Sequence, residues 1–226
     1  MKNLKSIAAG LCAALVLVGC NVSNTAKGTA IGAGGGAVVG AIIGKMAGNT
    51  AIGAVIGGTV GATTGAIIGK KMDKAKKEAE AVKNAQVETI TDANGLEAVK
   101  VTFDSGILFA TSKADLNATS KASLTQFAEV LKENRDMDIA IIGHTDNTGS
   151  DAINNPLSKN RAQSVSKFLK SQGVASAQIK TIDGQGSTNP VADNSTAEGR
   201  KQNRRVEVYM YASEKMINEA NAEAAK

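Results

Sequence analysis

The chain has 226 residues, 42% of them apolar, and a formal net charge of +5. This length holds one ordinary domain plus additional segments. All six aromatic residues lie beyond residue 100, whereas 14 of the 24 glycines lie between residues 28 and 69. Because a core needs large side chains, we predict one globular core in the C-terminal half, which excludes a single large enzyme domain. No basic run is interleaved with aromatic residues, which argues against nucleic-acid binding.

Residues 1–19 have the organisation of a signal peptide, with two lysines, an apolar run and small residues before Cys20. The apolar run is shorter than the roughly 20 residues that a spanning helix needs. The alternatives are an uncleaved anchor and a soluble secreted protein in which Cys20 is incidental. The sequence Leu-Val-Gly-Cys that ends at Cys20 resembles a bacterial lipobox, which implies that Cys20 is acylated and that residues 20–27 are a lipid-anchored linker. Cys12 leaves with the signal, so the mature chain contains no cysteine pair.

Glycine recurs at every fourth position through residues 28–48 and again through 53–69. The segment Thr-Ala-Ile-Gly-Ala occurs in both series, 21 residues apart. A spacing of four puts the glycines on one helix face, where a second backbone can approach closely, whereas a flexible linker has no such register. We predict an antiparallel helical hairpin over residues 28–69, which resembles the glycine-zipper segments of bacterial envelope proteins. Insertion in a membrane, assembly into a homo-oligomer and packing of the hairpin on itself remain open.

Residues 70–85 are rich in lysine, acidic residues and alanine. We interpret this segment as a solvated helix that acts as a stiff spacer. Residues 86–212 contain the predicted domain, and residues 213–226 are interpreted as a polar tail.

Hydrophobic patterning predicts five strands and two helices in the domain. The strands are predicted at 86–91, 96–103, 139–142, 179–183 and 206–211, and the helices at 116–134 and 156–172. Asn94-Gly95 suits a type I′ turn between the first two strands. Asn155 is a suitable N-cap for the second helix, with Pro156 in its first turn. This order predicts an α/β fold, an α+β sandwich with helices packed on a mixed sheet.

Polar residues concentrate in the loop 143–149 and in the helix that follows it. His144, the only histidine, is two residues from Asp146, which raises the possibility of a hydrolase. However, the sequence has no Gly-x-Ser-x-Gly elbow, Cys20 is the only cysteine that survives processing, and one histidine does not make a usual metal cluster. We therefore predict no enzyme activity, no cofactor and no metal site.

Asp146 and Arg161 suit a zwitterionic ligand, because a carboxylate binds an ammonium group and a guanidinium group forks onto a carboxylate. Free N–H groups near Leu157 and Ser158, at the predicted helix start, would favour a further negative group. In the alternative interpretation, Asp146 and Arg161 form a structural salt bridge and Asn154 caps the loop. Spacing alone does not decide between the two.

Separated motifs in residues 96–211 resemble the OmpA-like peptidoglycan-binding domain. They are Gly143-His144-Thr145-Asp146, Asn154, Leu157-Ser158, Arg161-Ala162, Gly184-Gln185-Gly186 and Asn203-Arg204-Arg205-Val206-Glu207. The resemblance implies non-enzymatic binding of the peptide stem of the cell wall at meso-diaminopimelate. It further implies that Asp146 takes the ammonium group and Arg161 the carboxylate, and that the pocket is completed by Asn154 and backbone groups around Thr145, Leu157 and Ser158. Arg205 is a weaker candidate, because pairing with Glu207 explains it equally well.

The whole chain resembles an outer-membrane lipoprotein of the OmpA family with a glycine zipper. This implies a tether held in the outer membrane by acyl chains on Cys20, with its C-terminal domain bound to peptidoglycan in the periplasm. The alternative is an envelope assembly protein that acts through the glycine hairpin and uses the wall domain only as an anchor. One departure concerns the Phe-Asp pair that the family usually has before the first helix. Two pairs compete as its counterpart here, Phe103-Asp104 and Phe109-Ala110. The spacing to Leu116 and onward to Asp146 favours Phe109-Ala110, which lacks the acid.

Overall fold

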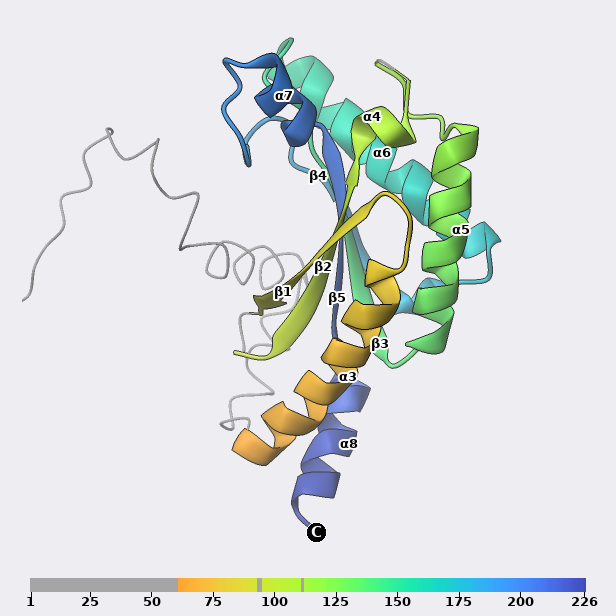
Figure 1. The fold of residues 1–226 in the computed structure, drawn as a ribbon, viewed down its shortest axis with the longest axis vertical. Coiled ribbons are helices and arrows are strands. Elements are labelled where there is room, and N and C mark those ends of the chain that lie inside the picture. The colour runs from red at the N-terminus through yellow and green to blue at the C-terminus, as the bar shows by residue number, and fades with distance from the viewer. Residues whose placement is uncertain (1–60, 93–94, 111) are drawn as a thin grey trace, which may run out of the picture. The chain divides into compact units, whose positions relative to one another are not determined.

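The computed structural model describes residues 61–92, 95–110 and 112–226 (Figure 1). The predicted signal peptide, Cys20, the linker 20–27 and most of the predicted glycine hairpin lie outside the described residues. Within the part of the chain that is described, no helix is both long and apolar enough to cross a membrane.

Five strands form one mixed sheet in the order β1-β2-β5-β3-β4. They are β1 (Ala85–Thr91), β2 (Glu97–Asp104), β3 (Met137–Gly143), β4 (Ile179–Gly184) and β5 (Arg205–Ala212). Strands β3 and β4 are parallel, and the other neighbouring strands are antiparallel. All five predicted strands are present, and their ends differ from the prediction by at most two residues. The predicted fold class, helices on a mixed sheet, is confirmed.

Helices α5 (Ala118–Glu133) and α6 (Asp151–Ser171) lie on the same side of the sheet (Figure 1). The main core forms between these helices and the sheet, and the rings of Phe103 on β2 and Phe127 on α5 meet edge to face with centroids 5.4 Å apart. A smaller apolar cluster that includes Tyr209 and Tyr211 of β5 lies apart from this core. Two short helices, α4 (Ser105–Leu108) and α7 (Ala197–Asn203), lie in segments where the sequence analysis places neither a helix nor a strand.

Helix α6 begins five residues before the predicted start, at Asp151 rather than Pro156. Ser150 is the N-cap residue, and its carbonyl accepts hydrogen bonds from the N–H groups of Ile153 and Asn154. The prediction of Asn155 as the N-cap was therefore wrong. Pro156 is tolerated inside the helix because it lies close to the N-terminal end, where its missing N–H removes a single hydrogen bond from the helix.

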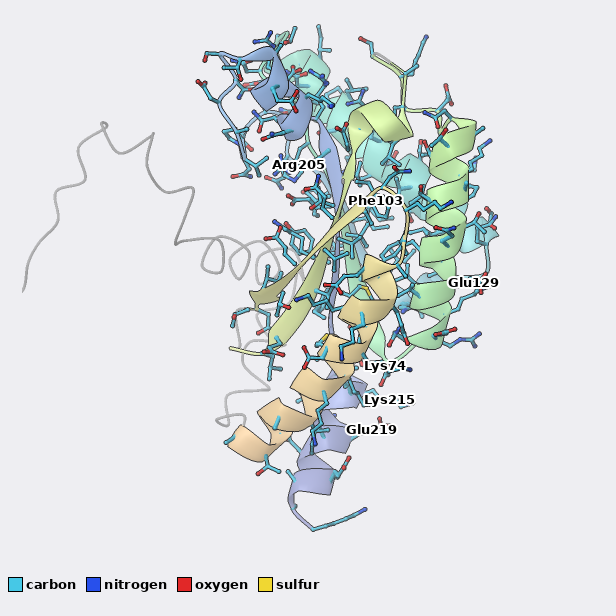
Figure 2. The ribbon with its side chains drawn as sticks, viewed as in Figure 1. Lys74, Phe103, Glu129, Arg205, Lys215 and Glu219 are labelled. Atoms are coloured by element: carbon cyan, nitrogen blue, oxygen red, sulfur yellow. The ribbon has the colours of Figure 1, made fainter. Side chains whose placement is uncertain are left out.

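Helix α3 (Ala62–Glu80) crosses the boundary that we predicted between the glycine hairpin and the charged spacer. Ile68, Met72, Ala75 and Ala79 form a buried stripe at helical spacing, and the helix packs against β1, β2 and α8. Exposed lysines such as Lys74 occupy other faces of the helix (Figure 2). The interpretation of residues 70–85 as a solvated spacer was wrong for this helix, because small and unbranched apolar side chains provide a packing face between the lysines.

The predicted polar tail forms helix α8 (Glu214–Ala224). The Ser213 hydroxyl caps the helix by accepting a hydrogen bond from the Met216 N–H at 3.1 Å. Met216, Ile217 and Ala220 are buried, and α8 packs against α3. The folded unit therefore extends on both sides of the predicted domain 86–212, from α3 to α8.

We expect Met72→Ala to lower the free energy of unfolding by about 2–5 kcal/mol, because it removes a fully buried side chain from the contact between α3 and the core. Lys74→Ala is the matched control, since the Lys74 side chain is 66% exposed. It should change the free energy by no more than about 0.5 kcal/mol. Urea denaturation measures both values. Equal stability of the two variants would mean that α3 does not contribute to the folded domain.

Candidate functional site

A pocket of about 680 Å³ opens where β3 ends and α6 begins. Its polar lining consists of Ser105, Ser112, Thr145, Asp146, Thr148, Asn154, Arg161 and Arg204, and its apolar lining of Phe109, Ala110, Ile153 and Leu157. Segments far apart in the sequence therefore meet here: the region after β2, the loop after β3, the first turns of α6 and the end of α7. The lining combines charged groups of both signs with an apolar wall, as small-molecule binding sites commonly do.

Two glycines bring α6 close to the sheet at this place. Gly143 ends β3 and Gly184 ends β4, and a Cβ atom at either position would collide with the α6 backbone at Ser158 or Lys159. The Ser158 hydroxyl also accepts a hydrogen bond from the Gly186 N–H at 3.0 Å. Glycine is required at both strand ends because only a residue without a side chain allows this approach.

The loop after β3 is held by backbone and side-chain hydrogen bonds. The Thr145 N–H donates to the Gly186 carbonyl at 2.8 Å. From the first turn of α6, the Asn154 amide donates to the carbonyls of Asp146 at 3.4 Å and Thr148 at 3.1 Å. Asn154 therefore caps the loop and also lines the pocket, so the two interpretations of this residue are compatible.

Asp146 forms an ion pair with Arg204 and not with Arg161. Arg204 Nη1 lies 2.5 Å from Asp146 Oδ2, and the Thr148 N–H donates to Asp146 Oδ1 at 2.8 Å. Burial alone would raise the pKa of Asp146, but the hydrogen bonds from Arg204 and Thr148 hold the pKa of this carboxyl below its usual range. The carboxylate is therefore charged at neutral pH, and it remains on the pocket wall.

Arg161 is buried against the apolar side of the pocket. Its Nε donates to the Lys113 carbonyl at 3.1 Å, and its guanidinium carbon lies 5.2 Å from the centroid of the Phe109 ring. Burial lowers the pKa of Arg161, the charge of Arg204 lowers it further, and the charge of Asp146 raises it. Among the described residues, the terminal nitrogens of Arg161 have no acceptor, and no salt bridge joins Arg161 to Asp146. The structural salt bridge that we considered between these residues is absent.

Five of the six predicted ligand-binding residues line the pocket: Thr145, Asp146, Asn154, Leu157 and Arg161. Ser158 does not, because its hydroxyl is fully buried between the Asn155 carbonyl and the Gly186 N–H. Leu157 and Ser158 lie inside α6, where each N–H donates to a carbonyl one turn earlier. The prediction of free N–H groups at these two residues was therefore wrong.

Sequence reasoning missed Arg204. Its neighbour Arg205 is the weaker candidate of the sequence analysis, but Arg205 Nε donates to Glu207 Oε1 at 2.7 Å and Arg205 does not line the pocket. The motif Asn203-Arg204-Arg205 nevertheless indicates that one arginine lies apart from Glu207. The side chains of adjacent residues point in opposite directions where a strand begins, so only one of the two arginines can lie on the same side as Glu207. The sequence does not say which of the two faces Asp146.

His144 belongs to a buried network rather than to the pocket. Its Nε2 lies 3.2 Å from Glu207 Oε2, a carboxylate that also accepts from Arg205 and from the Tyr209 hydroxyl. Nδ1 of the ring is buried without a hydrogen-bond partner among the described residues. Burial lowers the pKa of His144, more than the contact with Glu207 raises it. Burial alone would raise the pKa of Glu207, but hydrogen bonds and charges from its partners hold it well below the usual range.

Two family matches cover most of the chain. Residues 108–204 match the OmpA family, and residues 1–73 match the YMGG-like Gly-zipper. The chain contains an OmpA-family domain. The OmpA-family domain includes most of the pocket lining, from Phe109 to Arg204.

Several curated proteins are similar to part of this chain. The chain is 47% identical over 108 residues to the protein named "Probable lipoprotein YiaD" from Escherichia coli, which covers 48% of this chain and 46% of that protein. "Peptidoglycan-binding protein ArfA" from Mycobacterium tuberculosis is 46% identical over 102 residues, covering 45% of this chain and 31% of that protein. Eight curated relatives, these two included, are matched over 31 to 64% of their own length.

A solved structure shares the fold of the OmpA-family domain. The cell wall anchor of the T6SS from Pseudomonas aeruginosa superposes with a TM-score of 0.52 at 27% identity. The match covers 63% of this chain and 97% of that chain. The superposed part of this chain is longer than the OmpA-family match over residues 108–204. This agrees with a folded unit that extends beyond the predicted domain.

The His144 ring of the OmpA-family domain is expected to make stability fall in mild acid. Its native pKa lies below the ordinary 6.5, so the unfolded chain takes up a proton first as the pH drops. The contribution of His144 to the free energy of unfolding should therefore be at its maximum above about pH 6.5. The free energy of unfolding should decrease as the pH is lowered from there toward the native pKa. Urea denaturation between about pH 7.5 and 5.5 measures this slope.

His144→Gln is the control for this prediction, because it keeps a hydrogen-bonding group but removes the titration. Its stability should depend less steeply on pH in the same range. His144 is the only histidine, so its ring signals in an NMR titration are unambiguous. A ring that titrates above pH 6.5, or equal slopes in the two proteins, contradicts the prediction.

Proposed function

We propose that the chain is a non-enzymatic lipoprotein that tethers the outer membrane to the cell wall. In this proposal, the OmpA-family domain binds the diaminopimelate-containing stem peptide of peptidoglycan, and acyl chains on Cys20 hold the other end in the membrane. The single observation that carries the proposal is the pocket, in which the Asp146 carboxylate and the Arg161 guanidinium face one cavity without pairing with each other.

The chemistry of the pocket suits the side chain of diaminopimelate. That side chain ends in an ammonium group and a carboxylate on one carbon, carried on a short methylene chain. Asp146 is charged and can accept from the ammonium group, while the terminal N–H groups of Arg161 can donate in pairs to the carboxylate. Phe109 and Leu157 supply apolar surface for the methylene groups.

Unpaired hydroxyl groups give further support. Ser105 Oγ and Thr145 Oγ1 are buried without a hydrogen-bond partner among the described residues, and both residues line the pocket. Buried polar groups are normally paired, and an unpaired one costs free energy. A polar ligand that rearranges these hydroxyls into hydrogen bonds would offset that cost.

The names of the relatives point in the same direction. ArfA is named a peptidoglycan-binding protein, the similar solved structure is a cell wall anchor, and YiaD is named a probable lipoprotein.

A tether of this kind does not need tight binding by each domain. Many copies link the same membrane to the same sacculus, so binding is multivalent and a modest affinity of each domain suffices. The expected location is the outer membrane, with the OmpA-family domain in the periplasm.

We expect Asp146→Asn to weaken binding of a diaminopimelate-containing stem peptide at least tenfold, because the amide does not carry the charge that pairs with the ammonium group. Asp151→Asn is the matched control, since Asp151 is exposed on the first turn of α6 outside the pocket lining. Calorimetric titration measures affinity, and thermal denaturation checks folding. Equal affinities of the two folded variants would contradict the proposed site.

A second candidate function, envelope assembly through the glycine hairpin, is favoured by the Gly-zipper match over residues 1–73. Deletion of residues 28–60 separates the two functions. It must stop before Ala62, because α3 packs on the domain. If the chain is chiefly a tether, binding to purified sacculi should persist after the deletion and the envelope defect should be mild. A severe envelope defect with intact wall binding would favour the assembly function.

A further inference from the structure

The pocket carries more positive than negative charge. Among the described lining residues, the charged side chains are the guanidinium groups of Arg161 and Arg204 and the carboxylate of Asp146. A ligand group with one ammonium and one carboxylate is neutral and leaves this excess unbalanced. The inference drawn from this excess rests on the proposed function, because it concerns the same pocket.

The backbone fixes Arg204 at the edge of the pocket. Its N–H donates to the Arg200 carbonyl at 3.1 Å, and its carbonyl accepts from the Ser105 N–H at 2.8 Å. Its side chain is 37% exposed. Within the described residues, Asp146 is the only acceptor that contacts this guanidinium, through Nη1, so Nε and Nη2 retain donors for a ligand.

Asp146 can bind Arg204 and a ligand ammonium at the same time. Each carboxylate oxygen has two lone pairs. The Thr148 N–H occupies one site on Oδ1, and Arg204 Nη1 occupies one site on Oδ2. An ammonium group that enters the pocket therefore does not need to displace Arg204.

The two guanidinium groups act on each other across the pocket. Burial lowers the pKa of Arg161 and the charge of Arg204 lowers it further, because two cations that line one cavity repel each other. One carboxylate on Arg161 relieves part of this repulsion. A second carboxylate on Arg204 would balance the remaining charge and use the available donors in a bidentate pair.

We propose that the pocket selects a ligand with two carboxylates for one ammonium group, and that Arg204 binds the second carboxylate while it stays against Asp146. The first carboxylate, beside the ammonium group, binds Arg161. In a stem peptide, the second is either the glutamyl α-carboxylate or the carboxylate on the other carbon of diaminopimelate. Arg204 thus determines specificity for the carboxylate over the carboxamide form of the stem.

Three N-acetylated stem tripeptides, Ala-γ-Glu-diaminopimelate, test this proposal. One has all carboxylates free, one is amidated at the glutamyl α-carboxylate, and one is amidated at the diaminopimelate carboxylate distant from the ammonium group. Calorimetric titration of the purified full chain in detergent should show that one of the two amides binds about tenfold more weakly than the free peptide. In Arg204→Gln this difference should disappear, because the group that recognises the second carboxylate is gone.

Two further variants separate the role of Arg204 from general electrostatics. Lys201→Gln removes one positive charge one turn away, outside the pocket lining, and should keep the discrimination. Ala110→Asp adds a carboxylate to the lining at an exposed position and should weaken the preference for the free peptide, because the lining becomes neutral. Thermal denaturation verifies that each variant is folded.

The outcomes distinguish this inference from the proposed function. If the full chain binds the free peptide and both amides equally, the second-carboxylate site is overturned and stem binding stands. If Arg204→Gln discriminates as strongly as the original chain, or if Lys201→Gln loses the discrimination, Arg204 is not the group responsible and the inference is overturned. If the full chain binds none of the peptides, the proposed function fails together with this inference.

Discussion

The close approach of helix α6 to the ends of β3 and β4 is the constraint on which the pocket depends. Gly143 and Gly184 leave space for the α6 backbone, and the Ser158 hydroxyl ties the helix to Gly186. This contact places the loop after β3 beside the first turns of α6, so that Asp146 and Arg161 face one cavity. Ser158, which lies outside the cavity, supports the site by fixing this distance.

The loop after β3 also separates two kinds of charged group. His144 enters a buried network around Glu207, whereas Asp146, two residues later, lies on the pocket wall with Arg204. Arg205 and Arg204 divide in the same way on the facing segment. The buried network satisfies the Glu207 carboxylate within the protein, and the pocket keeps guanidinium donors available. Adjacent residues therefore contribute to the buried network and to the pocket wall without competing for the same partners.

The sequence was sufficient to predict the strands of the sheet, because they alternate with turn signals and helical periods. The motifs also singled out Asp146 and Arg161, which both line the pocket. It was insufficient for α3 and α8, because their packing faces consist of residues such as Met72, Ala75 and Ala220 among charged neighbours, a pattern equally typical of solvated helices. Arg204 was missed for a different reason. It meets Asp146 across 58 positions in the sequence, and only the tertiary fold shows which of two adjacent arginines makes that contact.

The placement of α3 has a mechanical consequence. Figure 1 shows the start of α3 beside α8 at one end of the domain and α4 and α7, which flank the pocket, at the other. In the proposed tether, tension would enter through α3 and leave through the ligand, so the load would run along the domain. The apolar stripe of α3 and its contacts with β1, β2 and α8 then bear the load first. If the chain acts as the proposed tether, detachment of α3 would lengthen it before the pocket is disturbed.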